Sequence, residues 1–151
     1  MKLIGKQTNI LALRKISNLF QTASFEVDEL LAMVMDSAKD IVGAKNASLL
    51  LVQDEKTLKL QFYQASGKNM GELKEIDLPP GVGISGLVAK TGDSVISNDV
   101  SQDPRWYQKV SEKVKISVKC MASFPLMHEK KVIGVVQFLD KVDESVFSKE
   151  D

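Results

Sequence analysis

The feature that most constrains the fold of this chain is a change of hydrophobic period, from helical to strand-like, just after Gly43. Residues 27–42 carry one wide apolar stripe at three- and four-residue steps, which predicts an amphipathic helix that ends at this glycine. Residues 47–63 have a short apolar run, a polar turn and then alternation, the pattern of an antiparallel hairpin with one buried face. A second hairpin is predicted over residues 118–139, around a polar turn at 128–130.

Shorter elements lie between and after the two hairpins. Residues 73–78 and 94–97 predict brief strands, and residues 84–90 and 104–114 predict short helices. Together with the hairpins they give a sheet of about six strands with helices packed on it. The predicted fold class is therefore α+β with an antiparallel six-stranded sheet. The last residues, 147–151, resemble the start of a further helix.

The N-terminal residues 3–20 predict another amphipathic helix. Its apolar residues recur at steps of three, four and seven: Leu3, Ile10, Leu13, Ile16 and Phe20. Two interpretations stay open, because this spacing suits a helix packed on its own domain and also the seam of a short coiled coil. In the second case residues 1–22 form a linker or dimer helix.

Length and charge bound the class of protein. A chain of 151 residues is expected to form one domain with a substantial core. Its 20 Lys and Arg residues balance its 20 Asp and Glu residues, so no electrostatic attraction to nucleic acid or to an anionic membrane is expected. No apolar run approaches the ~20 residues that span a bilayer, and residues 1–8 lack the apolar region of a signal peptide. These features predict a cytoplasmic protein.

Side chains suited to catalysis are scarce. The single cysteine, Cys120, excludes an internal disulfide, and the single histidine, His128, excludes a multi-histidine metal centre. Cys120 is predicted to lie on a strand and His128 at a charged turn, so they are not expected to form a catalytic pair. Paired carboxylates occur in turns, without the apolar surroundings that raise a carboxyl pKa. The sequence predicts no catalytic site.

Residues 81–86 match the pattern G-x-G-x-x-G, with the sequence Gly81-Val82-Gly83-Ile84-Ser85-Gly86. A dinucleotide-binding fold is not expected, because the motif follows a Pro-Pro turn and lies between hairpins instead of in a βαβ unit. Glycines before a helix start nevertheless expose backbone N–H groups at the positive end of the helix dipole, which favours an anion. The alternative is that the glycines only make a tight entry into the helix.

Two neighbouring aromatic residues form a second candidate site. Trp106 and Tyr107 follow Asp103-Pro104-Arg105 in a segment that is otherwise poor in apolar residues. Their rings are suited to line a pocket and stack on a flat ligand. In the alternative interpretation one ring packs on the edge of the sheet and the other is partly exposed.

The ordered set of motifs resembles a GAF domain, the small-molecule-sensing module of signalling proteins, over about residues 25–151. Each motif is weak alone, and the order of the set is what makes the resemblance specific. The matching segments are 28–31, 47–52, 80–86 with Thr91-Gly92, 99–104, 123–126 and 132–139.

The resemblance implies a GAF/PAS-like, profilin-type architecture with an antiparallel six-stranded sheet and helices on both faces. It also implies a pocket on one face of the sheet, roofed by residues 81–118. GAF domains usually form dimers through their terminal helices, which favours a dimer or linker role for residues 1–22. The GAF domain itself would span residues 23–151 and be cut at the start of its C-terminal helix.

A narrower resemblance concerns the cyclic-nucleotide-binding GAF domains of phosphodiesterases and adenylyl cyclases. Their signature is N-K, a variable loop, then F-x-x-x-D-E. Asp140-Lys141 and Phe147-Ser148-Lys149-Glu150-Asp151 match it, with Asp140 in place of Asn and the final Glu absent. The resemblance implies that Lys141 pairs with Asp151 and pins the lid of the pocket.

The expected ligand contacts come from this resemblance and from the aromatic pair. Ser48 would lie on the pocket floor, and Gln137 would take the place of a polar base-reading side chain. The backbone N–H groups of Ile84 and Ser85 would bind phosphate. The remaining expected contacts line the roof: Trp106, Tyr107 and Ser111. Other polar roof positions of the family fall on Val114 and Val118, so fewer polar anchors are expected here.

The predicted function is that of a small-molecule-sensing GAF domain in a multidomain signalling protein, with cAMP or cGMP as candidate ligand. The ligand would be purine-like, the domain a homodimer, and the attached output domain a cyclase, phosphodiesterase or histidine kinase. A ligand-free dimerisation or spacer module is the alternative. The methionine sulfoxide reductases of this fold use several cysteines, and bilin-binding members need a cysteine near the roof helix, so both are disfavoured by the single Cys120.

Overall fold

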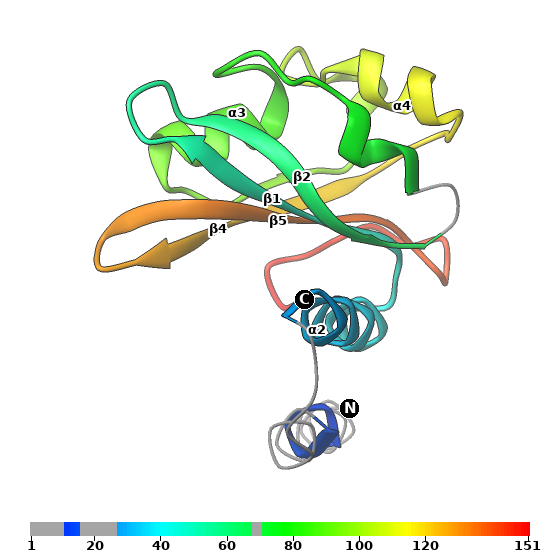
Figure 1. Ribbon diagram of the computed structural model, residues 1–151. Helices are drawn as coiled ribbons and strands as arrows, with labels where there is room; N and C mark the ends of the chain where they lie inside the picture. The colour runs from blue at the N-terminus through cyan, green and yellow to red at the C-terminus, as the bar shows by residue number, and fades with distance from the viewer. Residues whose placement is uncertain (1–10, 16–26, 68–70) are drawn as a thin grey trace.

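The computed structural model describes residues 11–15, 27–67 and 71–151, and a five-stranded sheet forms its centre (Figure 1). The strands lie in the order β2-β1-β5-β4-β3, and all neighbours are antiparallel. Their bounds are Ala44–Asp54 for β1, Lys59–Ser66 for β2, Val95–Ser97 for β3, Met121–His128 for β4 and Lys131–Lys141 for β5. The two longest strands, β1 and β5, pair at the centre of the sheet.

Helices cover both faces of this sheet. Helix α2 (Val27–Val42) lies on one face, while α3 (Gly83–Thr91) and α4 (Gln108–Val114) lie on the other (Figure 1). Two short 3₁₀ helices, η1 (Gly71–Glu75) and η2 (Val100–Gln102), join the α3 side, where their residues Leu73 and Val100 belong to its core. The sheet therefore separates two hydrophobic cores.

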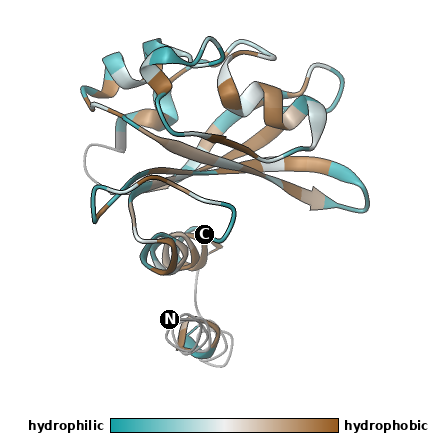
Figure 2. Cartoon of the chain, turned by 180° about the vertical axis from the view of Figure 1, so that it is seen from behind, coloured by the Kyte–Doolittle hydropathy of each residue, from teal (hydrophilic) through white to brown (hydrophobic). Residues whose placement is uncertain are grey.

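Strand alternation assigns residues to these cores. On β1, Leu49 packs towards α2 and Leu50 towards α3. On β5, Phe138 packs towards α2, whereas Val135 and Leu139 pack towards α3. Successive strand side chains point to opposite faces, so a strand covered on both faces is apolar on both. Hydrophobic residues accordingly concentrate on the strands in Figure 2.

Both predicted hairpins and the helices at 27–42 and 84–90 are confirmed, within a few residues at their ends. The turn between β4 and β5 consists of Glu129 and Lys130, with φ angles of 48° and 70°. Positive φ at both central residues is the geometry of a type I′ turn, which matches the twist of the flanking strands. The helix predicted over 104–114 begins only at Gln108.

The prediction of a strand at 73–78, and with it the six-stranded sheet, is wrong. The segment instead begins inside η1, where the backbone N–H of Ile76 donates to the carbonyl of Leu73 at 3.0 Å. Leu73, Ile76 and Leu78 are all buried in the α3-side core. A three-residue step brings Leu73 and Ile76 to one side of a 3₁₀ turn, whereas a strand would send them to opposite faces.

The C-terminal end of the chain differs from the prediction, and the N-terminal helix is described only in part. Residues 147–151 end in a turn, closed by a hydrogen bond from the N–H of Asp151 to the carbonyl of Ser148 at 3.1 Å, and not in a helix. Of the helix predicted over 3–20, the described residues 11–15 are helical. The rest of that helix lies outside the described residues, so its packing stays a prediction. Across the described ranges, no helix has both the length and the apolar character that a membrane crossing requires.

Candidate functional site

A cavity lies between the α3-side face of the sheet and the segments that cover it. Every predicted ligand contact lines it: Ser48, Ile84, Ser85, Trp106, Tyr107, Ser111 and Gln137. These residues come from β1, α3, the segment before α4, α4 itself and β5. The cavity has a volume of about 50 Å³, enough for a few waters. The fold therefore assembles the predicted set, and whether these residues contact a ligand stays a prediction.

The glycine-rich segment makes a tight entry into α3. Gly83 has a φ of +76°, which glycine adopts without strain. Gly86 lies so close to the preceding turn that a Cβ on it would be 2.5 Å from the carbonyl carbon of Gly81. Dense backbone packing thus accounts for the glycines at these positions. The sequence left open the alternative that the glycines only make a tight entry into the helix. The close approach of Gly86 to Gly81 and the positive φ of Gly83 support this alternative.

The same packing exposes the N-terminal end of α3 to the cavity. No side chain caps this end, and its first turn contains no acidic residue. Gly83, Ile84 and Ser85, which form that turn, all line the cavity. The first N–H groups of a helix have no partner within the helix, and the helix dipole adds partial positive charge there. This end of the cavity is suited to an anion.

The floor of the cavity carries a buried polar line, which we define as Ser48, Gln137 and Ser123. The hydroxyl of Ser48 donates to Oε1 of Gln137 at 3.4 Å. Nε2 of Gln137 donates to Oγ of Ser123 at 3.4 Å and to Sδ of Met121 at 3.7 Å. The three residues stand opposite one another on neighbouring strands β1, β5 and β4. Sequence analysis missed Ser123, which only the register between β4 and β5 brings beside Gln137.

The aromatic pair belongs to the roof. Trp106 and Tyr107 are both half-buried and both line the cavity, as in the pocket interpretation. Tyr107 packs directly over the entry to α3, because a Cβ on Gly83 would be 3.0 Å from its Cβ. The N–H of Trp106 donates to the carbonyl of Asp103 at 3.1 Å, which anchors the pair to the preceding turn.

That turn is held by an ion pair. The Nε and terminal nitrogen of Arg105 donate to the two carboxylate oxygens of Asp103 at 2.9 and 2.7 Å. The hydrogen bonds from Arg105, together with one involving Ser97, hold the pKa of Asp103 well below its usual range, although burial opposes this shift. The carboxylate therefore stays ionised and supports the roof next to Trp106.

The rest of the roof is apolar. Val118 lines the cavity, and Val114 is buried in the core on the same side of the sheet. These are the two roof positions at which the family has polar residues and this chain has valine. The hydroxyl of Ser111 donates to the carbonyl of Gln108 within α4 at 2.9 Å, so its proton is already engaged. Few polar groups of the roof remain for a ligand.

The predicted pair of Lys141 and Asp151 is present, with 2.6 Å between Nζ and Oδ1. Nζ also donates to the carbonyl of Val42 at 3.0 Å and lies 5.6 Å from the ring centre of Phe147. Burial would raise the pKa of Asp151, but hydrogen bonds from Lys141 and Ser148 lower it overall. Neither Lys141 nor Asp151 lines the cavity. The pair fastens the C-terminal segment to the end of α2, on the opposite face of the sheet from the roof.

The single cysteine and histidine lie away from the cavity. Cys120 is buried in the α2-side core, where burial above all raises the pKa of its thiol. His128 is exposed at the end of β4. Within the described ranges, no three His, Cys, Asp or Glu side chains gather in a way that would hold a metal ion.

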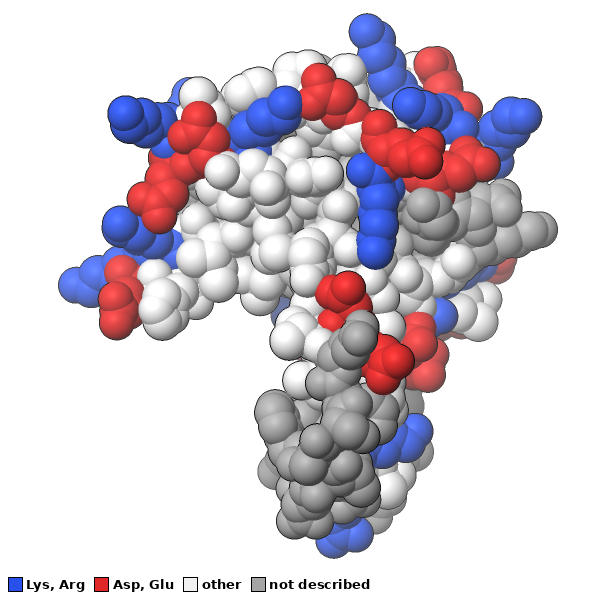
Figure 3. Space-filling model, in the orientation of Figure 1, with Lys and Arg blue, Asp and Glu red and all other residues white. Residues whose placement is uncertain are grey.

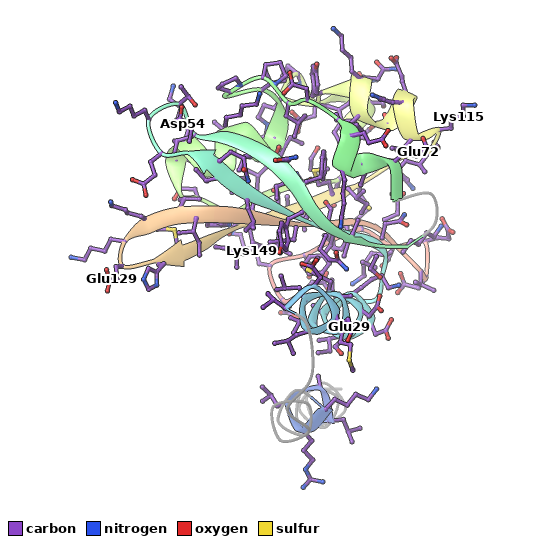
Figure 4. The ribbon with its side chains drawn as sticks, viewed as in Figure 1. Glu29, Asp54, Glu72, Lys115, Glu129 and Lys149 are labelled. Atoms are coloured by element: carbon purple, nitrogen blue, oxygen red, sulfur yellow. The ribbon has the colours of Figure 1, made fainter. Side chains whose placement is uncertain are left out.

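Every residue that lines the cavity is uncharged. Charged side chains of both signs instead mix along the rim of the molecule, around a broad uncharged area (Figure 3). Figure 4 shows Asp54 and Glu129 at the ends of the hairpins and Lys115 pointing outwards beyond α4. Among the groups that line this uncharged cavity, the end of α3 contributes partial positive charge through the helix dipole.

The family model described as GAF domain matches residues 26–151. The chain therefore belongs to the GAF domain family, whose members are regulatory modules, and the sequence-based resemblance is confirmed.

The chain is similar to proteins known from their sequences and to solved structures. The chain is 31% identical over 159 aligned positions to the probable 3′,5′-cyclic phosphodiesterase pde-5 of Caenorhabditis elegans, covering 95% of this chain and 22% of that protein. Among solved structures, the GAF domain of an Acinetobacter phosphoenolpyruvate-protein phosphotransferase aligns with a TM-score of 0.75 at 18% identity, over 97% of this chain and 82% of that one. A Staphylococcus aureus NreA protein mutated in its nitrate binding site aligns with a TM-score of 0.68 at 20% identity, over 82% and 92%. The chain thus spans about a fifth of the length of the phosphodiesterase that it matches.

Proposed function

We propose that this GAF domain is a cytoplasmic sensor that binds a cyclic nucleotide, cAMP or cGMP, in the cavity beneath α3 and α4. The observation that carries the proposal is the pairing of two features in one neutral cavity: an uncapped helix end and a buried polar floor. A cyclic nucleotide has a matching anionic end and a polar base edge. The similarity to a probable cyclic phosphodiesterase supports the same ligand class.

The phosphate would bind at the first turn of α3. A cyclic phosphate carries one negative charge, and the N–H groups of Ile84 and Ser85 at the start of α3 are suited to donate hydrogen bonds to its oxygens. Tyr107, packed over Gly83, lies beside that turn. The base would then extend across the cavity towards Gln137 and Ser48, with Trp106 available for stacking.

Binding requires the roof to move. Ligand pockets typically have volumes of ~300–1,000 Å³, far more than the space open in this structure. If only a fraction of the molecules has an open roof, the apparent affinity equals the intrinsic affinity multiplied by that fraction. We propose that this movement, passed through the sheet to α2 and the terminal helices, regulates an output domain elsewhere in a longer protein.

The small cavity also favours a second candidate, a ligand-free dimerisation or spacer module. In that case the side chains around the cavity, such as Phe62 and Leu73, fill the space permanently. The two functions differ in a single observable, the binding of a ligand.

Calorimetric titration of the 151-residue chain with cAMP and cGMP tests the proposal. We expect saturable binding of at least one of them and a rise in thermal midpoint. The substitution Tyr107→Ala should weaken binding by about 10- to 100-fold, since a hydrogen bond to a charged group contributes ~1.5–3 kcal/mol. Ser85→Pro should also weaken it, by removing an N–H in the first helical turn where proline is tolerated.

Tyr63→Phe is the matched control. It removes a phenol that donates to Asp28 of α2 at 2.7 Å, on the other side of the sheet, and should leave the affinity unchanged. Absence of heat and of thermal stabilisation with both nucleotides would reject the sensor in favour of the spacer. Binding that neither Tyr107→Ala nor Ser85→Pro weakens would move the site away from the cavity.

A further inference from the structure

A second hollow lies at the other end of α3. It opens between the end of this helix and the tips of both hairpins, which Asp54 and Glu129 mark on the same side of the molecule in Figure 4. We name it the hairpin groove; residues within the ranges 52–58, 89–92 and 127–133 line it, and its volume is about 490 Å³. The described residues that line it are all different from those that line the cavity.

Two irregularities of the backbone direct apolar side chains into this groove. Leu58 has a φ of 58°, a left-handed conformation that bulky residues rarely adopt, and its N–H donates to the carbonyl of Asp54 at 2.8 Å. On β5, pairing with β4 passes from Gly134 to Val132, so Ile133 is the extra residue of a β-bulge. Val132 and Ile133 therefore both line the groove, although neighbours on a regular strand face opposite sides.

The groove combines apolar surface with exposed polar groups. Met127 is 51% and Ile133 46% exposed, which leaves two large apolar side chains available for contact. The polar side chains that line the groove are all exposed: Glu55, Lys90, Thr91, Lys130 and Lys131. A small-molecule site orients its ligand through a few precisely placed polar groups inside a concave pocket. Apolar surface with a polar rim is instead typical of a protein interface.

The charges around the groove favour an acidic partner. Among the described residues that line it, three are lysines and one is a glutamate. Glu55 pairs with Lys131 at 3.8 Å, whereas Lys90 and Lys130 form no ion pair with any described residue. One of these two lysines belongs to α3 and the other to the turn between β4 and β5, so their ammonium groups come from different walls of the groove.

The end of α3 opposes an acidic partner only weakly. The last carbonyls of a helix carry partial negative charge, about half a unit in total. Two of them are already engaged, because the hydroxyl of Thr91 donates to the carbonyl of Leu87 at 3.0 Å and the N–H of Gly92 to that of Val88 at 2.9 Å. The full charges of the two unpaired lysines therefore outweigh this partial charge.

We propose that the hairpin groove binds a segment of a partner protein in which carboxylates flank apolar side chains. The apolar side chains pack against Leu58, Met127 and Ile133, and the carboxylates pair with Lys90 and Lys130. The unbranched side chain of Met127 adapts to partners of different shape. An anionic membrane matches the groove less well, because a flat surface cannot follow a concave one.

Helix α3 connects this groove to the cavity. Its residues 83–85 line the cavity, and its residues 89–91 line the groove. Gly92 ends the helix against β5, since a Cβ on it would be 3.9 Å from Cγ2 of Val132. Resting on the proposed function, a nucleotide that moves the first turn of α3 also moves a wall of the groove. The nucleotide and the partner segment then change each other's affinity by the same factor.

Selection of short random peptides on the immobilised 151-residue chain tests the groove. We expect the enriched peptides to carry apolar residues flanked by Asp or Glu, and to bind with micromolar dissociation constants in fluorescence anisotropy, as small transient interfaces do. The double variant Lys90→Glu, Lys130→Glu should weaken binding about tenfold or more, because each substitution replaces an attraction by a repulsion. Met127→Ala should weaken it about fivefold through the loss of apolar contact.

The matched control is the double variant Lys115→Glu, Lys149→Glu. It makes the same change of charge at exposed lysines outside the groove. Lys115 and Lys130 also share a left-handed backbone, with φ angles of 56° and 70°. The control should leave peptide binding unchanged. The docking proposal would be overturned by enriched peptides that lack acidic residues, by equal losses in the two double variants, or by binding of phosphatidylserine vesicles in place of any peptide.

Repeating the measurement with saturating cGMP and cAMP separates docking from its coupling to the cavity. We expect the dissociation constant of the peptide to change about fivefold or more with the nucleotide that binds. An unchanged constant in the presence of a bound nucleotide would overturn the coupling through α3. A chain that binds peptides but neither nucleotide would reject the proposed function, and the coupling with it, while the docking site stands. A chain that binds a nucleotide but no peptide would reject the docking site alone.

Discussion

At the scale of single residues, close backbone packing of Gly86 against Gly81 shapes the entrance to α3 and so the end of the cavity that is suited to an anion. The Cβ of any other residue at position 86 would meet three backbone atoms of Gly81 at 2.5–3.0 Å. Backbone atoms cannot rotate aside as a side chain can. The distance between the turn and the helix therefore depends on glycine at this position.

Gly86→Ala should accordingly lower the free energy of unfolding by about 2 kcal/mol, in the range of overpacked sites. Urea denaturation measures this change. Gly43→Ala is the control, since Gly43 has a φ of +73° with no atom near its would-be Cβ and should cost only about 1 kcal/mol of backbone strain. An equal cost for the two variants would show that close approach is not what requires Gly86.

A second residue-scale prediction concerns pH. Because Arg105 lowers the pKa of Asp103 in the folded state, their pairing stabilises the fold above the unfolded pKa of ~3.9 and is lost as pH falls below it. Arg105→Met should cost about 0.5–1 kcal/mol at pH 6, since Arg105 is exposed, and progressively less from pH 4 to pH 2. Urea denaturation across this range tests it, with Lys109→Met on exposed α4 as control. A cost that is independent of pH would contradict the assignment.

At the scale of elements, the described part of the N-terminal helix leaves two leucines exposed. Leu11 is 59% and Leu13 64% exposed in residues 11–15. Leu13 belongs to the predicted seam with Ile10, Ile16 and Phe20, whereas Leu11 does not. The two side chains are therefore equivalent in exposure and different in the role that the sequence predicts for them.

If residues 1–22 form a dimer helix, Leu13→Glu should shift the chain from dimer to monomer, because it places a charge in the seam. Leu11→Glu should leave the oligomeric state unchanged. Sedimentation equilibrium at several concentrations measures both. A monomeric unsubstituted chain, or equal effects of the two substitutions, would reject the predicted seam.

The C-terminal segment and α2 form a second group of connected elements. Lys141 bonds to Val42 at the end of α2 and to Asp151, and the side chain of Asn98 donates to the carbonyl of Phe147 at 3.3 Å. Phe147 is almost fully buried in the α2-side core. The ends of the domain are thus fastened on one face of the sheet, while the cavity lies on the other.

At the scale of the whole molecule, the central strands connect these two faces. Gln137 faces the cavity and the next residue, Phe138, packs into the α2-side core, where its ring meets that of Phe124 at 6.1 Å between centres. A ligand that shifts Gln137 therefore acts on a strand that also supports α2. This arrangement is the physical basis of the relay proposed above.

Much of this architecture follows from local pattern. The hairpins and the helices at 27–42 and 84–90 were predictable because period, turn residues and glycine stops act over a few neighbours. The 3₁₀ turn that begins the segment 73–78 was not predictable, since the apolar residues of this segment suit a strand or a 3₁₀ turn, and packing in the α3-side core selects the turn. The pair Lys141–Asp151 was predictable from its motif, but the side of the sheet on which it acts was not.

The sequence by itself determined the family, the α+β class and seven of the residues that line the cavity, because ordered motifs and alternation carry that information. Tertiary structure alone decided the number of strands, the small volume of the cavity and the position of Ser123 beside Gln137. These properties depend on strand register and side-chain packing between residues distant in sequence. Gln137 and Ser123 are 14 residues apart, and only the pairing of β4 with β5 makes them one hydrogen-bonded unit.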